Sequence, residues 1–154
     1  MGLLEIVAKG IATYPTRRGG CYRRGVSTAE ATTNGICVEV DAVYSADHSS
    51  PAQGNWFFLY TVRIRNLGDE TVQLLSRHRV ITDATGKVEE ARGPGVVGEQ
   101  PVLQPGEAFE YTCGCPLTTP WGDMRGRYEM RMASGTRFDA EIPAFALRQP
   151  TALH

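Results

Sequence analysis

Gly93, Gly95 and Gly98 have the G-x-G-x-x-G spacing of a dinucleotide-binding motif. In proteins that use this motif, a strand leads into the glycines and a helix follows, so that the helix N-terminus faces a pyrophosphate. Here Pro101 and Pro105 follow closely, and proline cannot continue a helix. Two alternatives stay open: the loop amides bind an anion without a helix, or the glycines only shape a long connection.

Two valines lie inside this loop, between its second and third glycines. Apolar residues in such a connection either plug one end of the fold or stand at the surface for a partner to cover. We expect at least one of Val96 and Val97 to be exposed. The sequence therefore predicts a partner-binding or anion-binding loop at residues 93–101, which includes Glu99.

Four cysteines, Cys21, Cys37, Cys113 and Cys115, lack the C-x-x-C pairs of zinc ribbons, and no secretory apolar segment precedes them. Cys113 and Cys115 lie two apart and could bind a soft metal together with His78. Structural zinc needs four ligands, however, and catalytic zinc needs three and a water. The sequence therefore predicts no metal, no cofactor, and reduced thiols in a cytoplasmic protein.

No recognisable catalytic motif occurs in this chain. It has no G-x-S-x-G serine motif and no cysteine with an evident histidine and acid partner. Acidic pairs such as Glu89 with Glu90, or Glu107 with Glu110, are more typical of solvated strands and turns than of a glycosidase. We therefore expect a protein that is not an enzyme.

Charge and hydropathy argue against two classes of partner. The 16 Lys and Arg residues against 17 Asp and Glu give a formal net charge of -1, so no overall basic excess attracts nucleic acid. No apolar run reaches the roughly 18 residues of a membrane helix. We expect neither nucleic acid nor membrane as the main partner.

The N-terminal segment differs from the rest of the chain. Residues 1–32 carry five basic and two acidic residues, a net charge of +3. We interpret them as a basic N-terminal extension, which is either a solvated arm or an organelle-targeting segment. One domain then covers residues 33–147, and residues 148–154 form a C-terminal tail.

Apolar residues recur with a period of two from Gly35 onward, which is typical of half-buried strands. No convincing helical pattern interrupts them. The sequence predicts an all-β, two-sheet antiparallel sandwich of the immunoglobulin-like or fibronectin type III-like kind, with about seven strands. The predicted strands are 36–44, 56–65, 72–82, 87–91, 107–113, 127–132 and 136–142.

The segment from Asp123 to Tyr128 has the D-x-x-G-x-Y form of the tyrosine corner found in immunoglobulin-like sandwiches. In that motif the tyrosine hydroxyl bonds to upstream backbone, and a cysteine follows two residues later. Here Met130 takes that place, as expected of a core without a disulfide. The alternative is that Tyr128 is an ordinary strand aromatic.

A longer ordered series of residues closely resembles the ApaG domain. The resemblance covers residues 33–147 and is carried by Val72–His78, Ile81–Ala84, Gly95–Glu107, Gly114–Leu117, Thr119-Pro120, Met124, Gly126, Tyr128, Met130, Ile142-Pro143, Phe145 and Leu147. It implies a fibronectin type III-like or immunoglobulin-like sandwich. It names no catalytic residue.

The resemblance also implies a choice of functions. The same domain is appended to certain F-box proteins and to a DNA polymerase delta-interacting protein, which favours a non-catalytic protein-interaction module. Bacterial members are linked to a dinucleoside tetraphosphate hydrolase gene, to cobalt tolerance and to magnesium efflux. The alternative is therefore a nucleotide or phosphate binder connected with divalent-cation homeostasis. The protein partner is unknown, and a homodimer stays an open alternative.

One residue departs from the family pattern. Where the family usually has an aromatic side chain, this chain has Arg79. We expect this change on the outward face of the third predicted strand, where it would alter a partner groove. A second candidate partner surface is therefore the face of Arg77, His78 and Arg79.

Overall fold

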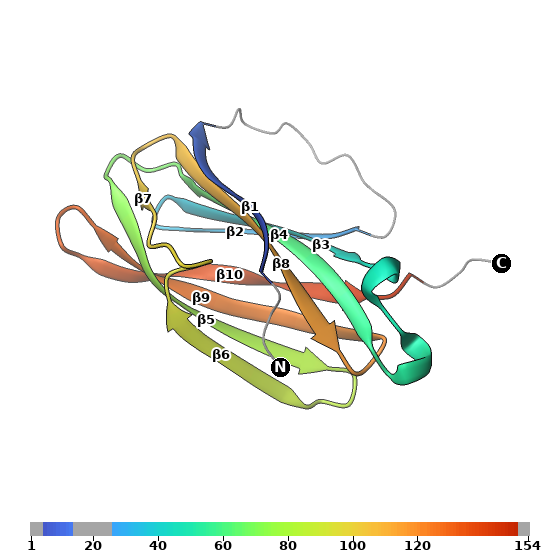
Figure 1. Ribbon diagram of the computed structural model, residues 1–154. Coiled ribbons are helices and arrows are strands. Elements are labelled where there is room, and N and C mark those ends of the chain that lie inside the picture. Colours follow the sequence, from blue (N-terminus) through green and yellow to red (C-terminus); the bar gives the residue numbers. More distant parts are fainter. Residues whose placement is uncertain (1–4, 14–25, 151–154) are drawn as a thin grey trace.

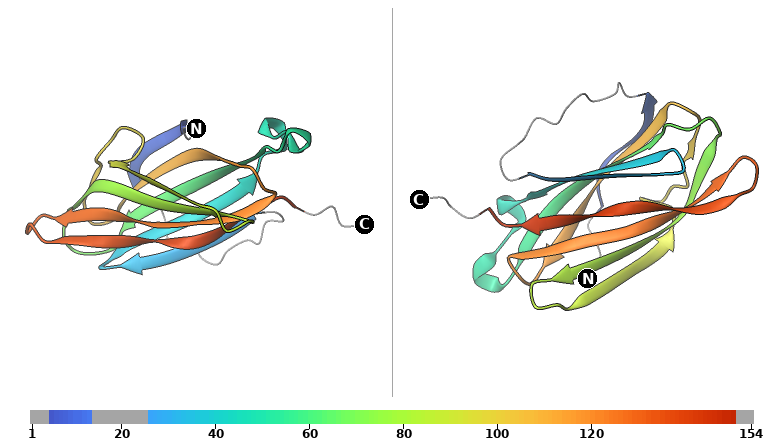
Figure 2. Two further views of the ribbon diagram at one scale, coloured as in Figure 1. Left: turned by 90° about the horizontal axis from the view of Figure 1, so that it is seen from below. Right: turned by 180° about the vertical axis from the view of Figure 1, so that it is seen from behind.

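The computed structural model describes residues 5–13 and 26–150, with side chains described from residue 26 onward. Ten strands form two antiparallel sheets that lie face to face (Figures 1 and 2). The first sheet has the order β1 (Glu5–Thr13), β8 (Glu107–Leu117), β4 (Trp56–Asn66), β3 (Ile36–Tyr44) and β2 (Val26–Thr33). The second has the order β10 (Arg137–Arg148), β9 (Trp121–Met132), β5 (Val72–Asp83) and β6 (Val88–Pro94), and the short β7 (Val102–Leu103) also pairs with β5.

The fold class expected from the alternating pattern is confirmed. In β4, every second side chain from Phe58 to Ile64 is buried between the sheets, while Thr61 and Arg63 lie half-buried on the outer face. Two single-turn 3-10 helices, Ala46–His48 and Pro51–Gln53, lie between β3 and β4. The seven predicted strands correspond to β3, β4, β5, β6, β8, β9 and β10, and β6, β8, β9 and β10 extend beyond their predicted ends by three residues or more.

The structure extends the sandwich beyond the predicted boundary at residue 33. Strand β2 pairs with β3 along its whole length, through a tight turn at Asn34 and Gly35, whose φ angles are 47° and 81°. Positive φ at both central residues is typical of a hairpin turn. Strand β1 pairs with β8. The interpretation of residues 1–32 as an extension is therefore wrong for these two segments, and residues 14–25 lie outside the described residues.

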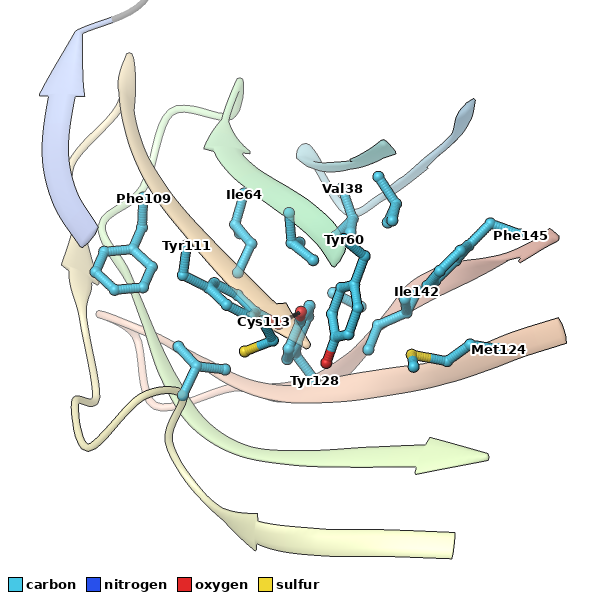
Figure 3. Close-up of a cluster of buried hydrophobic side chains, with 14 of the residues drawn as sticks. Val38, Tyr60, Ile64, Phe109, Tyr111, Cys113, Met124, Tyr128, Ile142 and Phe145 are labelled. Atoms are coloured by element: carbon cyan, nitrogen blue, oxygen red, sulfur yellow. Dashed lines mark hydrogen bonds between the residues drawn. The ribbon is translucent and has the colours of Figure 1, made fainter. Parts of the chain in front are cut away.

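The core lies between the two sheets, where the inward side chains of both meet (Figure 3). The predicted core residues Phe58, Tyr60, Val62, Tyr111, Tyr128 and Met130 are all buried there. Trp56 packs against the core at its edge, and its indole Nε1 donates a hydrogen bond to Gln149 Oε1 at 2.9 Å. Strand β10 packs against β2 and β3, which closes one side of the sandwich.

A β-bulge in β5 decides which residues of that strand point inward. Leu74 pairs with Met130, but the next pairing on β9 joins Ser76 to Glu129, so Leu75 is an extra residue. Such an insertion exchanges the two faces of a strand. Arg77 and Arg79 consequently lie on the inner face of the sheet rather than the outer one.

No helix among residues 5–13 and 26–150 is long and apolar enough to cross a membrane.

Candidate functional site

In the glycine loop between β6 and β7, three backbone amides donate hydrogen bonds to carbonyls of the protein itself. The Gly95 N–H donates to the Leu75 carbonyl, and Val96 and Glu99 exchange N–H···O bonds with each other, all at 2.8 Å. A Cβ at Gly95, whose φ is +60°, would collide with the Glu99 carbonyl oxygen. The loop is therefore a tight turn stabilised by its own backbone hydrogen bonds. Because these three amides already have acceptors, they are not available to bind an anion, which was one interpretation of the sequence.

The two valines of the loop do not form an exposed surface. Val96 is fully buried in the core, and Val97, with a φ of 43°, is half-buried and packs against the core. The expectation of an exposed valine is wrong, because the loop folds back over the end of the sandwich and plugs it. Gly98 and Glu99 remain exposed.

The Arg77 side chain forms hydrogen bonds with the backbone of this loop. Its guanidinium Nη1 donates to the Gly95 carbonyl at 2.8 Å and approaches the Pro94 carbonyl at 3.4 Å. Gly93, opposite Arg77 on β6, leaves the space that the guanidinium fills. Arg77 thus has a structural contact that explains its inward position.

The second predicted surface, the face of Arg77, His78 and Arg79, does not exist as one face. Strand alternation puts His78 on the opposite face from Arg77 and Arg79, and because of the bulge at Leu75 it is His78 that lies on the outer side of the sheet. There its Nε2 lies 3.1 Å from Glu90 Oε1. The expectation that Arg79 alters an outward partner groove is wrong, since only 4% of Arg79 is exposed.

Arg79 instead lies in the core among phenols and thiols, an arrangement that sequence reasoning missed. Its Nη1 donates a hydrogen bond to the Tyr60 hydroxyl, while its Nε is buried without any partner. Tyr60, Tyr111 and Tyr128 point toward the same region of the core in Figure 3. Arg79 reaches this cluster because of the bulge at Leu75. The alternating pattern of the sequence does not reveal that bulge.

Tyr128 does not form the predicted tyrosine corner. Its hydroxyl hydrogen-bonds the hydroxyl of Tyr111 across the two sheets, not upstream backbone. Strand β9 also continues straight through the Asp123–Tyr128 segment, so no crossing between sheets occurs there. Met130 fills the core as expected.

Burial keeps the three tyrosines and Cys115 of this cluster uncharged. It raises the pKa of Tyr60 and Tyr128 well above their ordinary values, and it raises the pKa of Tyr111 and of Cys115 to about 12. The reactive form of a cysteine is the thiolate. Cys115 is therefore a protonated, enclosed thiol at neutral pH and a poor nucleophile.

The proposed Cys113, Cys115 and His78 metal set is not brought together. Both cysteines are buried between the sheets, whereas His78 lies on the outer face of the second sheet. Cys37, Cys113 and Cys115 are all outside disulfides, which agrees with the prediction of reduced thiols, and Cys21 lies outside the described residues.

A different set of metal-type ligands occurs on the outer face of the first sheet. Ligand atoms of Glu30, Cys37 and Glu39 lie within 4.8 Å of one another. The Cys37 thiol donates to Glu30 at 3.3 Å, and burial raises the pKa of this thiol to about 11. Glu39 already forms an ion pair with Arg65 at 3.0 Å. A metal would have to displace both a proton and an arginine here.

A serine and a histidine also come together in the loop between β3 and β4. Ser45 Oγ lies 2.7 Å from His48 Nδ1, and the two residues belong to one exposed 3-10 turn. A catalytic pair also needs a third group that orients the histidine. The His48 ring instead lies against Phe57 in a tilted arrangement, at a centroid distance of 5.4 Å. This contact is explained by the local turn.

Strand β6 is the outermost strand of the second sheet and pairs only with β5 among the described strands. The Gly95 N–H donates to Leu75, and the Asp83 N–H donates to Lys87, at the two ends of this pair. Because hydrogen-bonded pairs alternate in an antiparallel ladder, the backbone groups of Val88, Glu90 and Arg92 point away from β5. This edge is exposed, and Val88 is 54% exposed.

Comparison with known proteins gives a consistent result. The family model described as the ApaG domain matches residues 46–132. Protein ApaG of Paramagnetospirillum magneticum is 57% identical over 119 residues, which cover 77% of this chain and 92% of that protein. Protein ApaG of Methylobacillus flagellatus is 51% identical over 117 residues, which cover 76% of this chain and 92% of the relative. A crystal structure of an ApaA protein from Bordetella pertussis is also similar, with a TM-score of 0.74 and 48% identity over 76% of this chain and 95% of that one.

Proposed function

The chain belongs to the ApaG family, and we propose that it acts there as a non-catalytic protein-interaction domain whose partner adds a strand to the edge of β6. The exposed edge carries this proposal. Three residues, Val88, Glu90 and Arg92, direct unpaired backbone donors and acceptors to the outside. Strand addition uses such groups for affinity and the alternating side chains for selectivity.

The chemistry of the described side chains supports a binding role over a catalytic one. The thiols of Cys37 and Cys115 are held protonated by burial. The Ser45–His48 contact belongs to a local turn. Cys37, Cys113 and Cys115 lie outside disulfides, which supports a reducing compartment, and we therefore propose a cytoplasmic location.

The charges of the edge determine which partner strands can pair well with it. A second copy that paired antiparallel about Glu90 itself would place Glu90 opposite Glu90, whereas a pairing about Ala91, the middle residue of β6, would place Glu90 opposite Arg92. Like charges directly opposite each other destabilise a strand pair. A partner segment with a basic residue opposite Glu90 avoids this repulsion, so we expect an extended segment of mixed or basic charge.

A single proline substitution in the edge strand tests this function. In Glu90→Pro the missing N–H points away from β5, so the sandwich should fold normally while strand addition is blocked. Glu90→Ala is the matched control, because it removes the same side chain and its contact with His78 but keeps the N–H. Affinity purification from the source cell should capture a protein with wild type and Glu90→Ala that is lost with Glu90→Pro.

Two outcomes contradict the proposal. One is capture of the same proteins by all three variants, and the other is capture of no protein by wild type. Size-exclusion chromatography with light scattering tests whether the chain forms a homodimer. A dimer that is lost only in Glu90→Pro would mean that the β6 edge is the binding surface but that its partner is a second copy of this chain.

A further inference from the structure

Arg79 is a buried cation, and at least one of its N–H donors has no acceptor. Only 4% of the residue is exposed, and its Nη1 donates to the Tyr60 hydroxyl. Its Nε–H is buried without a partner. A guanidinium stays protonated in proteins and carries five N–H donors. A buried charged donor that lacks an acceptor is costly, so this group calls for an explanation.

The residues beside Arg79 in its own sheet cannot supply an acceptor side chain. Its neighbour on β6 is Ala91, and its neighbour on β9 is Gly126. A Cβ at Gly126 would collide with the His78 carbonyl oxygen, so no larger residue fits there. The two residues that pair with Arg79 therefore offer no polar side chain to its guanidinium.

The groups that lie around Arg79 are phenols and thiols. They are Tyr60 from β4, Tyr111, Cys113 and Cys115 from β8, and Tyr128 from β9. Burial raises the pKa of Cys115 and of the three phenols, which keeps them neutral at physiological pH. An acid that acts on Cys115 is Glu89 of β6, and its side chain is 69% exposed. Among the described residues, the hydrogen-bond partner of Arg79 is thus a phenol, and no acid is hydrogen-bonded to its guanidinium.

We propose that the Arg79 guanidinium binds a small oxyanion, a carboxylate or an inorganic phosphate or sulfate, between the two sheets. Since Nη1 donates to Tyr60 and Nε has no partner, the ligand would approach the edge of the guanidinium that carries Nε. That edge of a guanidinium matches the two oxygens of a carboxylate or phosphate group. The ligand must be small, because Arg79 is almost fully enclosed. This site is separate from the β6 edge and goes beyond the proposed interaction function.

Ligand binding can be measured on the full chain with simple anions. Isothermal titration and thermal melting are carried out with sodium phosphate, sulfate and acetate, and with chloride at the same ionic strength as a monatomic control. The variants are wild type, Arg79→Met, and Arg125→Met. Arg125 is a matched control, because it is an exposed arginine on the outer face of the same sheet. Phosphate and sulfate against acetate distinguish an inorganic oxyanion from a carboxylate ligand.

Wild type and Arg125→Met should bind at least one oxyanion saturably, and their melting temperature should rise with its concentration. In Arg79→Met binding should be weaker by about tenfold or more, as expected when a bidentate charged contact is removed. Without oxyanion, Arg79→Met should melt at or above the temperature of wild type, because an unpaired buried charge has been removed. Chloride should cause no saturable rise.

The proposal is overturned if wild type binds none of the three oxyanions saturably, or if Arg79→Met binds as tightly as wild type. If Arg79→Met does not fold, Arg79→Lys replaces it, because lysine keeps the charge but lacks the planar fork. A wild-type crystal soaked in selenate gives an independent answer. Anomalous density beside Arg79 Nε supports the site, and density only at surface arginines contradicts it.

Discussion

The hydroxyls of Tyr111 and Tyr128 hydrogen-bond each other in the middle of the core, and they join the two sheets through the only polar atoms of two buried aromatic side chains. Tyr111 belongs to β8 of the first sheet and Tyr128 to β9 of the second. A buried hydroxyl that loses its partner costs more than a hydroxyl pair that is removed as a whole. This contact is therefore a sensitive probe of how the sheets are held in register.

Replacing one of these tyrosines should be worse than its lost bond alone. We expect Tyr128→Phe to lower the free energy of unfolding by about 1–3 kcal/mol, because it leaves the Tyr111 hydroxyl buried without a partner. The double variant Tyr111→Phe/Tyr128→Phe should cost less than the sum of the two single variants. Urea unfolding of the four proteins in a double-mutant cycle measures this coupling. Strict additivity would mean that the two hydroxyls do not stabilise each other.

Val96 should behave as a core residue although it lies in a glycine-rich loop. Val96→Asp places a charge in the apolar core and should lower the free energy of unfolding by several kcal/mol, about enough to unfold a domain of ordinary stability. Val88→Asp is the matched control, because Val88 is a valine that is 54% exposed on β6. Its effect should stay near about 0.5 kcal/mol. Circular dichroism melting compares the two, and equal melting temperatures would contradict the plug.

Arg77 should order the glycine loop. Arg77→Met keeps the length of the side chain but removes the donor to the Gly95 carbonyl, which accepts at 2.8 Å. A hydrogen bond from a charged donor is worth roughly 1.5–3 kcal/mol, so stability should fall by an amount in this range. Hydrogen exchange should also become faster at the amides of Gly95 and Val96. Unchanged exchange at both amides would show that the loop is held without Arg77.

The alternating pattern was sufficient to predict the strands that fill the core. In β3, β4 and β8 large apolar residues recur at every second position, and these strands lie where they were expected. Strand β2 was missed because its sequence, VSTAEATT, consists of small and polar residues and has no large apolar side chain after Val26. It is held by pairing with β3, a tertiary effect that local sequence does not carry.

The site could not be predicted for a related reason. Counting by twos along β5 from Val72 puts Arg77 and Arg79 on the outer face, and this holds only while the strand is regular. The extra residue Leu75 reverses the count, so both arginines lie inside. The glycine loop was expected to expose at least one of its two valines. Its residues Gly95, Val97 and Gly98 adopt positive φ angles, and Val96 is buried in the core.

The buried thiols should make the fold sensitive to alkali. Burial raises the pKa of Cys37 to about 11 and that of Cys115 to about 12, whereas an unfolded cysteine ionises near about 8.5. Between these values the unfolded chain releases thiol protons that the folded chain retains, so the unfolded state is favoured as pH rises. The contribution is complete below about pH 8 and is lost progressively above it.

In a Cys21→Ala background, the urea midpoint should therefore fall from pH 8 to pH 10, and the fall should be smaller in Cys115→Ala. Below about pH 10 the thiols dominate this effect, because unfolded tyrosines ionise only near that value. A thiol reagent at pH 8 gives a second reading of the same burial. Cys37, Cys113 and Cys115 should react slowly in the folded protein and all three should react quickly in urea. A flat urea midpoint over this range together with fast labelling of the folded protein would mean that these thiols are accessible to water.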